Sequence, residues 1–151
     1  MKQGIVGNGE DKFTEYGKAQ AMVIIADLLY DSTTTLVSGH SPVGGIDIWA
    51  EQFELAKGKT PIIYAPTTFQ WNPKTQDGYK WRNEMIAKES DAIVVIVADV
   101  YPNEYKGHRF KLCYHCRTTN HLKSGACWTA KKAMALGKPA TWYIVKNYAS
   151  V

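Results

Sequence analysis

The last third of this sequence is nearly devoid of acidic residues, and the first residues of the sequence lack a long apolar run. Nine basic and thirteen acidic residues precede position 100, whereas nine basic residues and one acid, Glu104, follow it, so the net charge of +4 divides into −4 and +8. A cleavable secretion signal would need a basic stretch before an apolar run, and residues 1–11 are polar and glycine-rich instead. The most apolar segment, residues 19–30, contains Asp27 and falls well short of the roughly 20 residues that span a membrane. We therefore expect a cytoplasmic protein with no membrane partner.

Cysteine is also scarce, with three residues that all lie within positions 113–127. An odd number of closely spaced cysteines does not resemble a secreted disulfide framework, and it indicates a reducing compartment with free or metal-bound thiols. The 151 residues, 45% hydrophobic and 21% charged, are typical of one folded domain, which we assign to residues 1–151. This composition excludes a largely disordered or low-complexity chain.

Apolar segments with strand-like patterns alternate with segments of helical period along the chain. The sequence predicts strands at residues 2–6, 34–38, 61–65, 92–98 and 139–145, and helices at residues 16–30, 46–57, 79–90 and 125–136. This alternation predicts an α/β fold, Rossmann-like and doubly wound, with a mainly parallel five-stranded sheet and a Cys/His-rich loop at residues 105–127. The polar residues 66–78, which include Phe69 and Trp71, are typical of a long functional loop.

Small residues occupy three junctions where a predicted strand or loop leads into a helix. They are Gly7, Asn8, Gly9, Ser38, Gly39, Gly44, Gly45, Ser124 and Gly125. Backbone N–H groups at such junctions can approach an anion, and the helix dipole favours negative charge there. The order of residues around Gly7 is not G-x-G-x-x-G and is as compatible with a tight turn as with phosphate contact. Asp47, in the first turn after Gly45, either binds a ribose hydroxyl or only stabilises the helix start.

Several of these motifs, in their order along residues 37–145, resemble the SLOG superfamily of Rossmann-like proteins. The motifs are Val37-Ser38-Gly39, Gly45-Ile46-Asp47, Arg82-Asn83, Ser124-Gly125-Ala126, Thr129-Ala130 and Ala135-Leu136-Gly137-Lys138-Pro139. Relatives in this superfamily include the Rossmann core of DNA processing protein A, the LONELY GUY phosphoribohydrolases, molybdenum-cofactor carrier proteins and the YspA/YpsA-like group, which this chain resembles most in size. The resemblance implies that a nucleotide or another phosphorylated small molecule binds at these loops.

The same resemblance implies that Arg82 and the helix start at Ser124-Gly125 lie near phosphate and that Thr129 is also a ligand-binding residue. Arginine geometry allows bidentate contact with phosphate, although an ion pair with Glu84 or Glu89 along the helix is the alternative for Arg82.

The chain departs from the phosphoribohydrolase pattern P-G-G-x-G-T-x-x-E, because lysines at 131 and 132 follow Thr129 and no carboxylate does. Cleavage of an N-glycosidic bond needs a group that donates a proton or activates water. If the chain is such a hydrolase, which remains an alternative function, Glu84, Asp47 or Glu51 must supply the carboxylate.

Three cysteines and three of the four histidines crowd into residues 108–127. The spacing Cys113-x2-Cys116-x4-His121-x5-Cys127 provides four soft ligands and is one residue longer than the zinc-knuckle pattern C-x2-C-x4-H-x4-C. It predicts a structural zinc site that leaves no open position for catalysis, the alternative being free cysteines packed under the loop. Because Cys127 lies in the helix start near Ser124, the metal and ligand sites are expected to be coupled.

Basic and aromatic residues interleave in the same segment. They are Lys106, Arg109, Lys111, Arg117, Lys123, Lys131 and Lys132, with Tyr105, Phe110, Tyr114 and Trp128. This pattern indicates either a single-stranded nucleic acid partner or a solvated basic face with its lysine stems packed along the surface.

The helix expected at residues 16–30 carries apolar side chains on more than one face. Tyr16, Ala19, Val23, Ala26 and Tyr30 mark one helical stripe, and Met22, Ile24, Ile25, Leu28 and Leu29 lie beside it. A helix that is apolar on several faces is buried or lies in an interface. We therefore expect a homo-oligomer, in its simplest form a homodimer.

Overall fold

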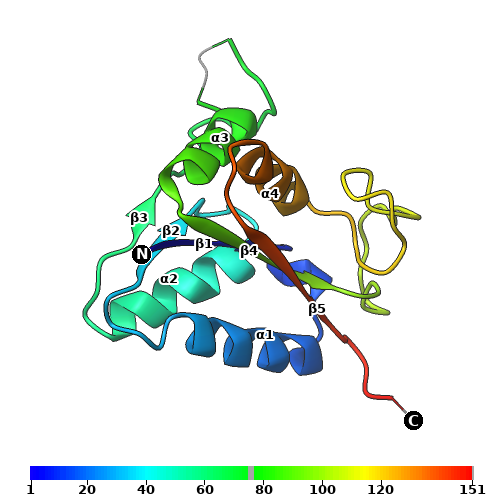
Figure 1. The fold of residues 1–151 in the computed structure, drawn as a ribbon. Coiled ribbons are helices and arrows are strands. Elements are labelled where there is room, and N and C mark those ends of the chain that lie inside the picture. The colour runs from blue at the N-terminus through cyan, green and yellow to red at the C-terminus, as the bar shows by residue number, and fades with distance from the viewer. Residues whose placement is uncertain (75–76, 151) are drawn as a thin grey trace.

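Figure 1 shows the computed structural model, which describes residues 1–74 and 77–150. Residues 75 and 76 of the expected 66–78 loop, and Val151 of the expected domain, lie outside the described part. The elements are β1 (Lys2–Gly7), a 3₁₀ turn (Glu10–Lys12), α1 (Glu15–Leu28), β2 (Thr35–Ser38), α2 (Ile46–Ala56), β3 (Ile62–Ile63), α3 (Tyr79–Glu89), β4 (Ala92–Ala98), α4 (Gly125–Ala135) and β5 (Ala140–Val145). All five strands are parallel and lie in the order β3-β2-β1-β4-β5, which confirms the predicted Rossmann-like fold.

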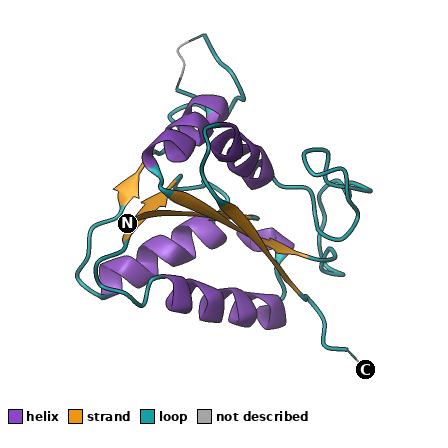
Figure 2. Cartoon of the chain, in the orientation of Figure 1, coloured by secondary structure: helices purple, strands orange, loops and turns teal. Residues whose placement is uncertain are grey.

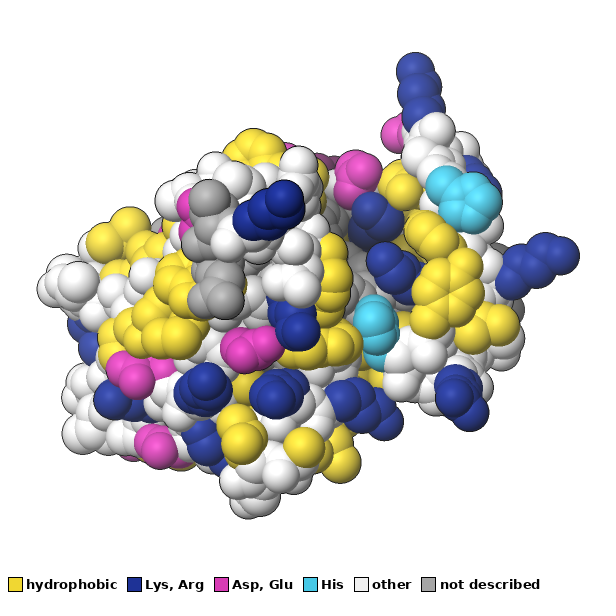
Figure 3. Space-filling model, turned by 90° about the horizontal axis from the view of Figure 1, so that it is seen from above, with side chains coloured by type: hydrophobic (Ala, Val, Ile, Leu, Met, Phe, Trp, Pro, Cys, Tyr) yellow, Lys and Arg dark blue, Asp and Glu magenta, His cyan; other side chains and the backbone are white. Residues whose placement is uncertain are grey.

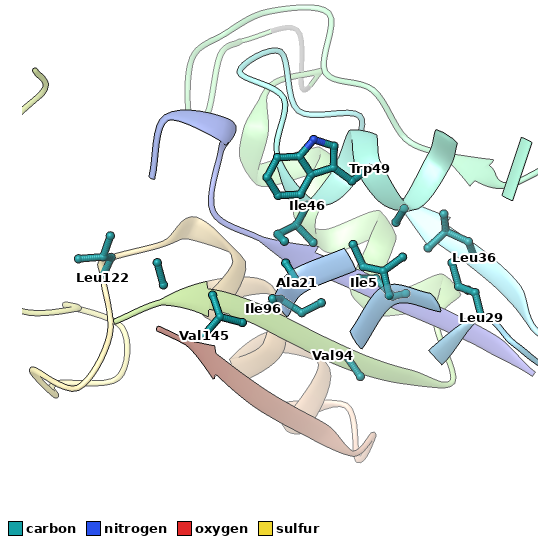
Figure 4. Close-up of a cluster of buried hydrophobic side chains, with 13 residues drawn as sticks. Ile5, Ala21, Leu29, Leu36, Ile46, Trp49, Val94, Ile96, Leu122 and Val145 are labelled. Carbon is teal, nitrogen blue, oxygen red and sulfur yellow. The ribbon is translucent and has the colours of Figure 1, made fainter. Parts of the chain in front are cut away.

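Two helices cover each face of the sheet. Helices α1 and α2 lie below it and α3 and α4 above it in the view of Figures 1 and 2. Strand β4 is apolar throughout because alternate side chains enter different cores: Val94 and Ile96 face α1 and α2, whereas Val95 faces α3 and α4. Figure 4 shows the lower core, in which Trp49 of α2 packs over the sheet.

Helix α1 forms where its sequence predicts, but its five-residue apolar stripe faces outward. Val23, in the middle of that stripe, is 70% exposed. The buried face instead contains Gly17, Ala21 and Ile25. A Cβ atom on Gly17 would lie 2.2 Å from Oδ1 of Asn147, so the absence of a side chain at Gly17 allows α1 to approach the segment after β5. The face of α1 with Gly17 and Ala21 is therefore the one that packs against the rest of the protein.

The strand order reverses between the neighbouring strands β1 and β4, because the chain runs from β1 to β2 and β3 on one side and from β4 to β5 on the other. In open α/β sheets the crevice beyond the carboxyl ends of the strands at such a reversal is the usual ligand site. The long loop of residues 99–124 leaves β4 at this edge and returns to the start of α4 (Figure 1). None of the helices in the described ranges combines the length and apolar character needed to cross a membrane.

Candidate functional site

A cavity of about 600 Å³ opens at this edge of the sheet, a volume typical of small-molecule sites. Its lining comes from the end of β1, the starts of α2, α3 and α4, the loop between β2 and α2, and the two long loops. The lining residues are Val6, Gly7, Ser41, Asp47, Trp71, Tyr79, Arg82, Asn83, Ile86, Tyr114, His115, Lys123, Ser124, Gly125, Ala126 and Thr129. Figure 3, seen from above, shows the surface hollowed between a larger lobe on the left and a smaller lobe on the right. Lys, Arg and His side chains stand at its margin.

The start of α4 forms one end of the cavity. The Ser124 hydroxyl caps the helix by accepting from the Ala126 backbone N–H at 3.2 Å. Gly125 adds no side chain, and Lys123 lines the cavity just before the helix. One turn further, Thr129 is fully buried, and its Oγ1 has no hydrogen-bond partner within the described ranges. A helix N-terminus flanked by a lysine is a favourable place for an anion.

Arg82 of α3 projects into the molecule and is 9% exposed, so the alternative ion pairs with Glu84 or Glu89 do not form. Its Nη1 donates to the Gly39 carbonyl oxygen at 2.7 Å and lies 3.6 Å from Oδ2 of Asp47. Gly39 leaves room for this contact, since a Cβ there would lie 2.4 Å from the same Nη1. The buried Nε of Arg82 finds no partner among the described residues. The guanidinium therefore has an unsatisfied donor on a side chain that lines the cavity.

Asp47 is the candidate carboxylate that lines the cavity. Its Oδ2 accepts from the Ser41 backbone N–H at 3.1 Å, and burial raises the pKa of its carboxyl from 3.8 to about 6 although Arg82 opposes the rise. The Glu51 carboxylate, one turn further along α2, accepts a hydrogen bond from the Ser38 hydroxyl at 2.6 Å. Its other oxygen lies 2.6 Å from Nδ1 of His40. Glu84 lines a separate small hollow on the other side of α3.

Only some of the residues predicted to bind the ligand line the cavity. Gly7, Asp47, Arg82, Ser124, Gly125 and Thr129 line the cavity, whereas Asn8, Gly9, Ser38, Gly39, Gly44 and Gly45 are not among the lining residues. The Asn8 side chain accepts from the Ala98 N–H at 2.9 Å and donates to the Lys123 carbonyl at 3.3 Å. Gly45 has a left-handed φ of 83°, and a Cβ there would lie 2.4 Å from the Asn8 carbonyl oxygen. Asn8 and Gly45 therefore hold the loops beside the cavity in place.

Several lining residues were not expected as ligand contacts from the sequence. Trp71, Tyr79, Tyr114 and His115 bring aromatic rings to the cavity from two loops and the start of α3. For Trp71, the presence of aromatic residues in a polar loop was a usable signal. Tyr114 was expected only as a base-stacking residue of a nucleic-acid-binding segment, and no local signal placed it at this cavity, because residues 99–124 have no periodic pattern.

The four residues Cys113, Cys116, His121 and Cys127 come together beside the cavity, with all their ligand atoms within 4.8 Å of one another. His121 Nδ1 lies 2.7 Å from Oδ1 of Asn120, which leaves Nε2 facing Cys127 Sγ at 3.6 Å. Burial lowers the pKa of His121, so the neutral, metal-binding imidazole is the favoured form. Trp142 Nε1 donates to Cys127 Sγ at 3.4 Å. The group can hold a metal ion.

The basic and aromatic side chains of the long loop partly pair with one another. Arg109 lies over the rings of Tyr101 and Tyr105, at 5.6 Å and 5.9 Å from their centroids, and Lys123 lies 5.0 Å from that of Phe110. Cation–π contacts of this kind stabilise the loop itself. Tyr114 remains 57% exposed at the cavity. Only part of the segment thus remains available to a partner.

No family model and no curated protein matches this sequence. A solved structure of DNA processing protein A from Helicobacter pylori, described for its single-stranded DNA binding mode, is similar in fold. It is 20% identical, superposes with a TM-score of 0.52 and covers 93% of this chain. This chain spans 64% of that structure's chain. The similarity shows that the two share a Rossmann-like fold.

Proposed function

We propose that the cavity binds a nucleotide or a nucleotide-derived ligand, with its phosphate at the start of α4. The observation that carries this proposal is the pair of buried polar atoms, Arg82 Nε and Thr129 Oγ1, that lack partners within the described ranges and belong to side chains lining the cavity. An unsatisfied buried polar group costs about 1–3 kcal/mol, which a phosphate oxygen would recover. Trp71, Tyr79 and Tyr114 offer apolar surface to a base.

Thr129→Val tests the phosphate contact because valine fills the same volume without the hydroxyl. Calorimetric titration with nucleoside 5′-monophosphates should show affinity reduced about tenfold, the effect of one lost hydrogen bond. The matched control is Thr141→Val on the exposed surface of β5, which should bind as wild type does. No binding of any nucleoside phosphate by the wild-type protein would refute the proposal.

We also propose that Cys113, Cys116, His121 and Cys127 hold a structural zinc ion. Three thiolates and one imidazole match the preference of Zn²⁺, and all four positions are protein ligands. The partners of His121 and Cys127 orient these ligands in the way that supporting residues do at metal sites. Elemental analysis of protein purified without added zinc should find one metal per chain. Substantially less would contradict the site.

A second candidate function, single-stranded DNA binding, is favoured by the fold shared with DNA processing protein A. The +8 charge of residues 100–151, together with exposed Tyr114, would supply phosphate neutralisation and base stacking. Oligonucleotide affinity should fall steeply with salt and on substitution of Arg117 or Lys123 by alanine. Absence of binding at low salt would eliminate this candidate.

Membership of the SLOG superfamily and a cytoplasmic location stay predictions.

A further inference from the structure

The four metal-ligand residues alternate along the chain with residues that form two walls of the cavity. Tyr114 and His115 lie between Cys113 and Cys116, and all four sit on one tight turn. The cavity residues at 123–126 lie between His121 and Cys127. No cavity-lining residue of the long loop is therefore more than a few positions from a ligand of the group.

We infer that metal loading of the Cys113, Cys116, His121 and Cys127 group controls ligand binding in the cavity, because it holds Tyr114 and His115 in place as one wall. This inference rests on the proposed function of the cavity. It adds that bound metal raises the affinity for nucleotide and that bound nucleotide raises the affinity for metal. Coupling of this kind is reciprocal: the factor by which the metal tightens nucleotide binding equals the factor by which the nucleotide tightens metal binding.

Apart from the burial of Cys113 in the core beneath α3 and α4 and the contact of the Phe110 and Tyr114 rings at 5.4 Å, the turn that carries Tyr114 has few interactions to hold it. The described residues of 99–124 contain one isolated bridge, between Cys113 and Thr118, and no helix or strand. Arg117 closes the turn with a left-handed φ of 56° and donates its N–H to the Cys113 carbonyl oxygen at 2.7 Å. Loops of this length without secondary structure are uncommon in compact domains unless something orders them. A metal joining residues 113 and 127 removes much of the loop's conformational freedom.

Helix α4 depends on the metal far less. Cys127 is fully buried, and the next turns of α4 place Ala130 and Ala133 in the core against Val95 and Ile86. Removing the metal should therefore release the turn and leave α4 folded. The phosphate end of the cavity, at Arg82 and Thr129, would persist, while the wall formed by Tyr114 and His115 would be lost.

Hydrogen exchange tests this without any nucleotide. Wild-type protein loaded with Zn²⁺ is compared with protein stripped by a chelator. Residues 113–122 should exchange much faster in the stripped protein, whereas β1, β4 and the body of α4 should keep their protection. Equal exchange of residues 113–122 in the two states, or failure of the chain to bind Zn²⁺, would overturn the inference whatever the cavity binds.

Binding measurements then test the coupling, with AMP and inorganic phosphate as probes. Stripping the metal should weaken AMP about tenfold, within the 5- to 150-fold range of typical couplings, and should weaken inorganic phosphate much less. AMP should raise Zn²⁺ affinity, measured by chelator competition, by the same factor. Cys116→Ser should reproduce the stripped state. His108→Gln, a histidine of the same loop outside the ligand group, should match wild type.

The outcomes separate the two proposals. If AMP binds the loaded and stripped proteins equally well, the coupling is refuted and the proposed function stands. If neither probe binds the loaded protein, the proposed function fails, and hydrogen exchange alone decides whether the metal orders the wall. Tyr114→Ala, which retains all four metal ligands, should weaken AMP as stripping does and leave Zn²⁺ affinity in the absence of AMP unchanged.

Discussion

At the scale of single residues, Asp47 links the cavity to pH. Its carboxyl is buried beside Ser41, with Arg82, Glu51 and His40 as the charged or titratable neighbours, and its pKa is raised to about 6 chiefly by burial. Between pH 3.8 and 6 the folded state therefore binds more protons than the unfolded state, and stability falls as pH rises. The rise from 3.8 to about 6 corresponds to at most about 3 kcal/mol.

Asp47→Asn should remove this contribution. Urea unfolding at a series of pH values should show that the variant gains stability relative to wild type as pH rises from 4 to 7. Glu84→Gln, a carboxylate on α3 outside the cavity, serves as the control and should leave the pH dependence unchanged. Parallel curves for wild type and Asp47→Asn would show that the Asp47 charge is not disfavoured by folding. Of the three carboxylates that the hydrolase alternative names, Asp47 is the one that lines the cavity.

At the scale of elements, the sequence predicted where helices and strands lie far better than which face of a helix is buried. Helix α2 begins at Ile46 and α3 at Tyr79, as expected, because apolar period and flanking glycines are local signals. The buried face of α1 could not be read in this way, since glycine at 17 matters through a contact with Asn147, 130 positions away. The positions of Tyr79 and His115 at the cavity escaped prediction because they too depend on contacts between distant segments.

Gly17→Ala tests this account of α1. Alanine is a better helix former than glycine by about 1 kcal/mol, so a helix limited by propensity would become more stable. Because the new Cβ would lie 2.2 Å from Asn147 Oδ1, we expect a loss of about 1–3 kcal/mol instead. Asn147 also holds the Thr14 cap of α1, with its Oδ1 3.0 Å from the Thr14 N–H, so it cannot move without cost. Chemical denaturation measures whether the free energy of unfolding falls or rises on Gly17→Ala. Val23→Ala on the exposed stripe should change stability by less than about 0.5 kcal/mol.

At the scale of the whole molecule, the outward stripe of α1 bears on the expected homodimer. Tyr16 and Val23 of α1, and Tyr30 just beyond its end, expose 50%, 70% and 86% of their surface. Two copies related by a twofold axis would bring each stripe against its own counterpart, with Val23, at the centre of the stripe, nearest to the axis.

Val23→Glu would therefore place two like charges close together and remove two apolar contacts. We expect sedimentation equilibrium to show a dimer for wild type and a monomer for Val23→Glu. The matched control is Met134→Glu, which adds the same charge at a half-exposed apolar position on α4, across the sheet from α1, and should leave the dimer intact. A wild-type monomer at concentrations well above micromolar would refute the dimer. A dimer lost equally in both variants would mean that added charge, and not the α1 stripe, decides association.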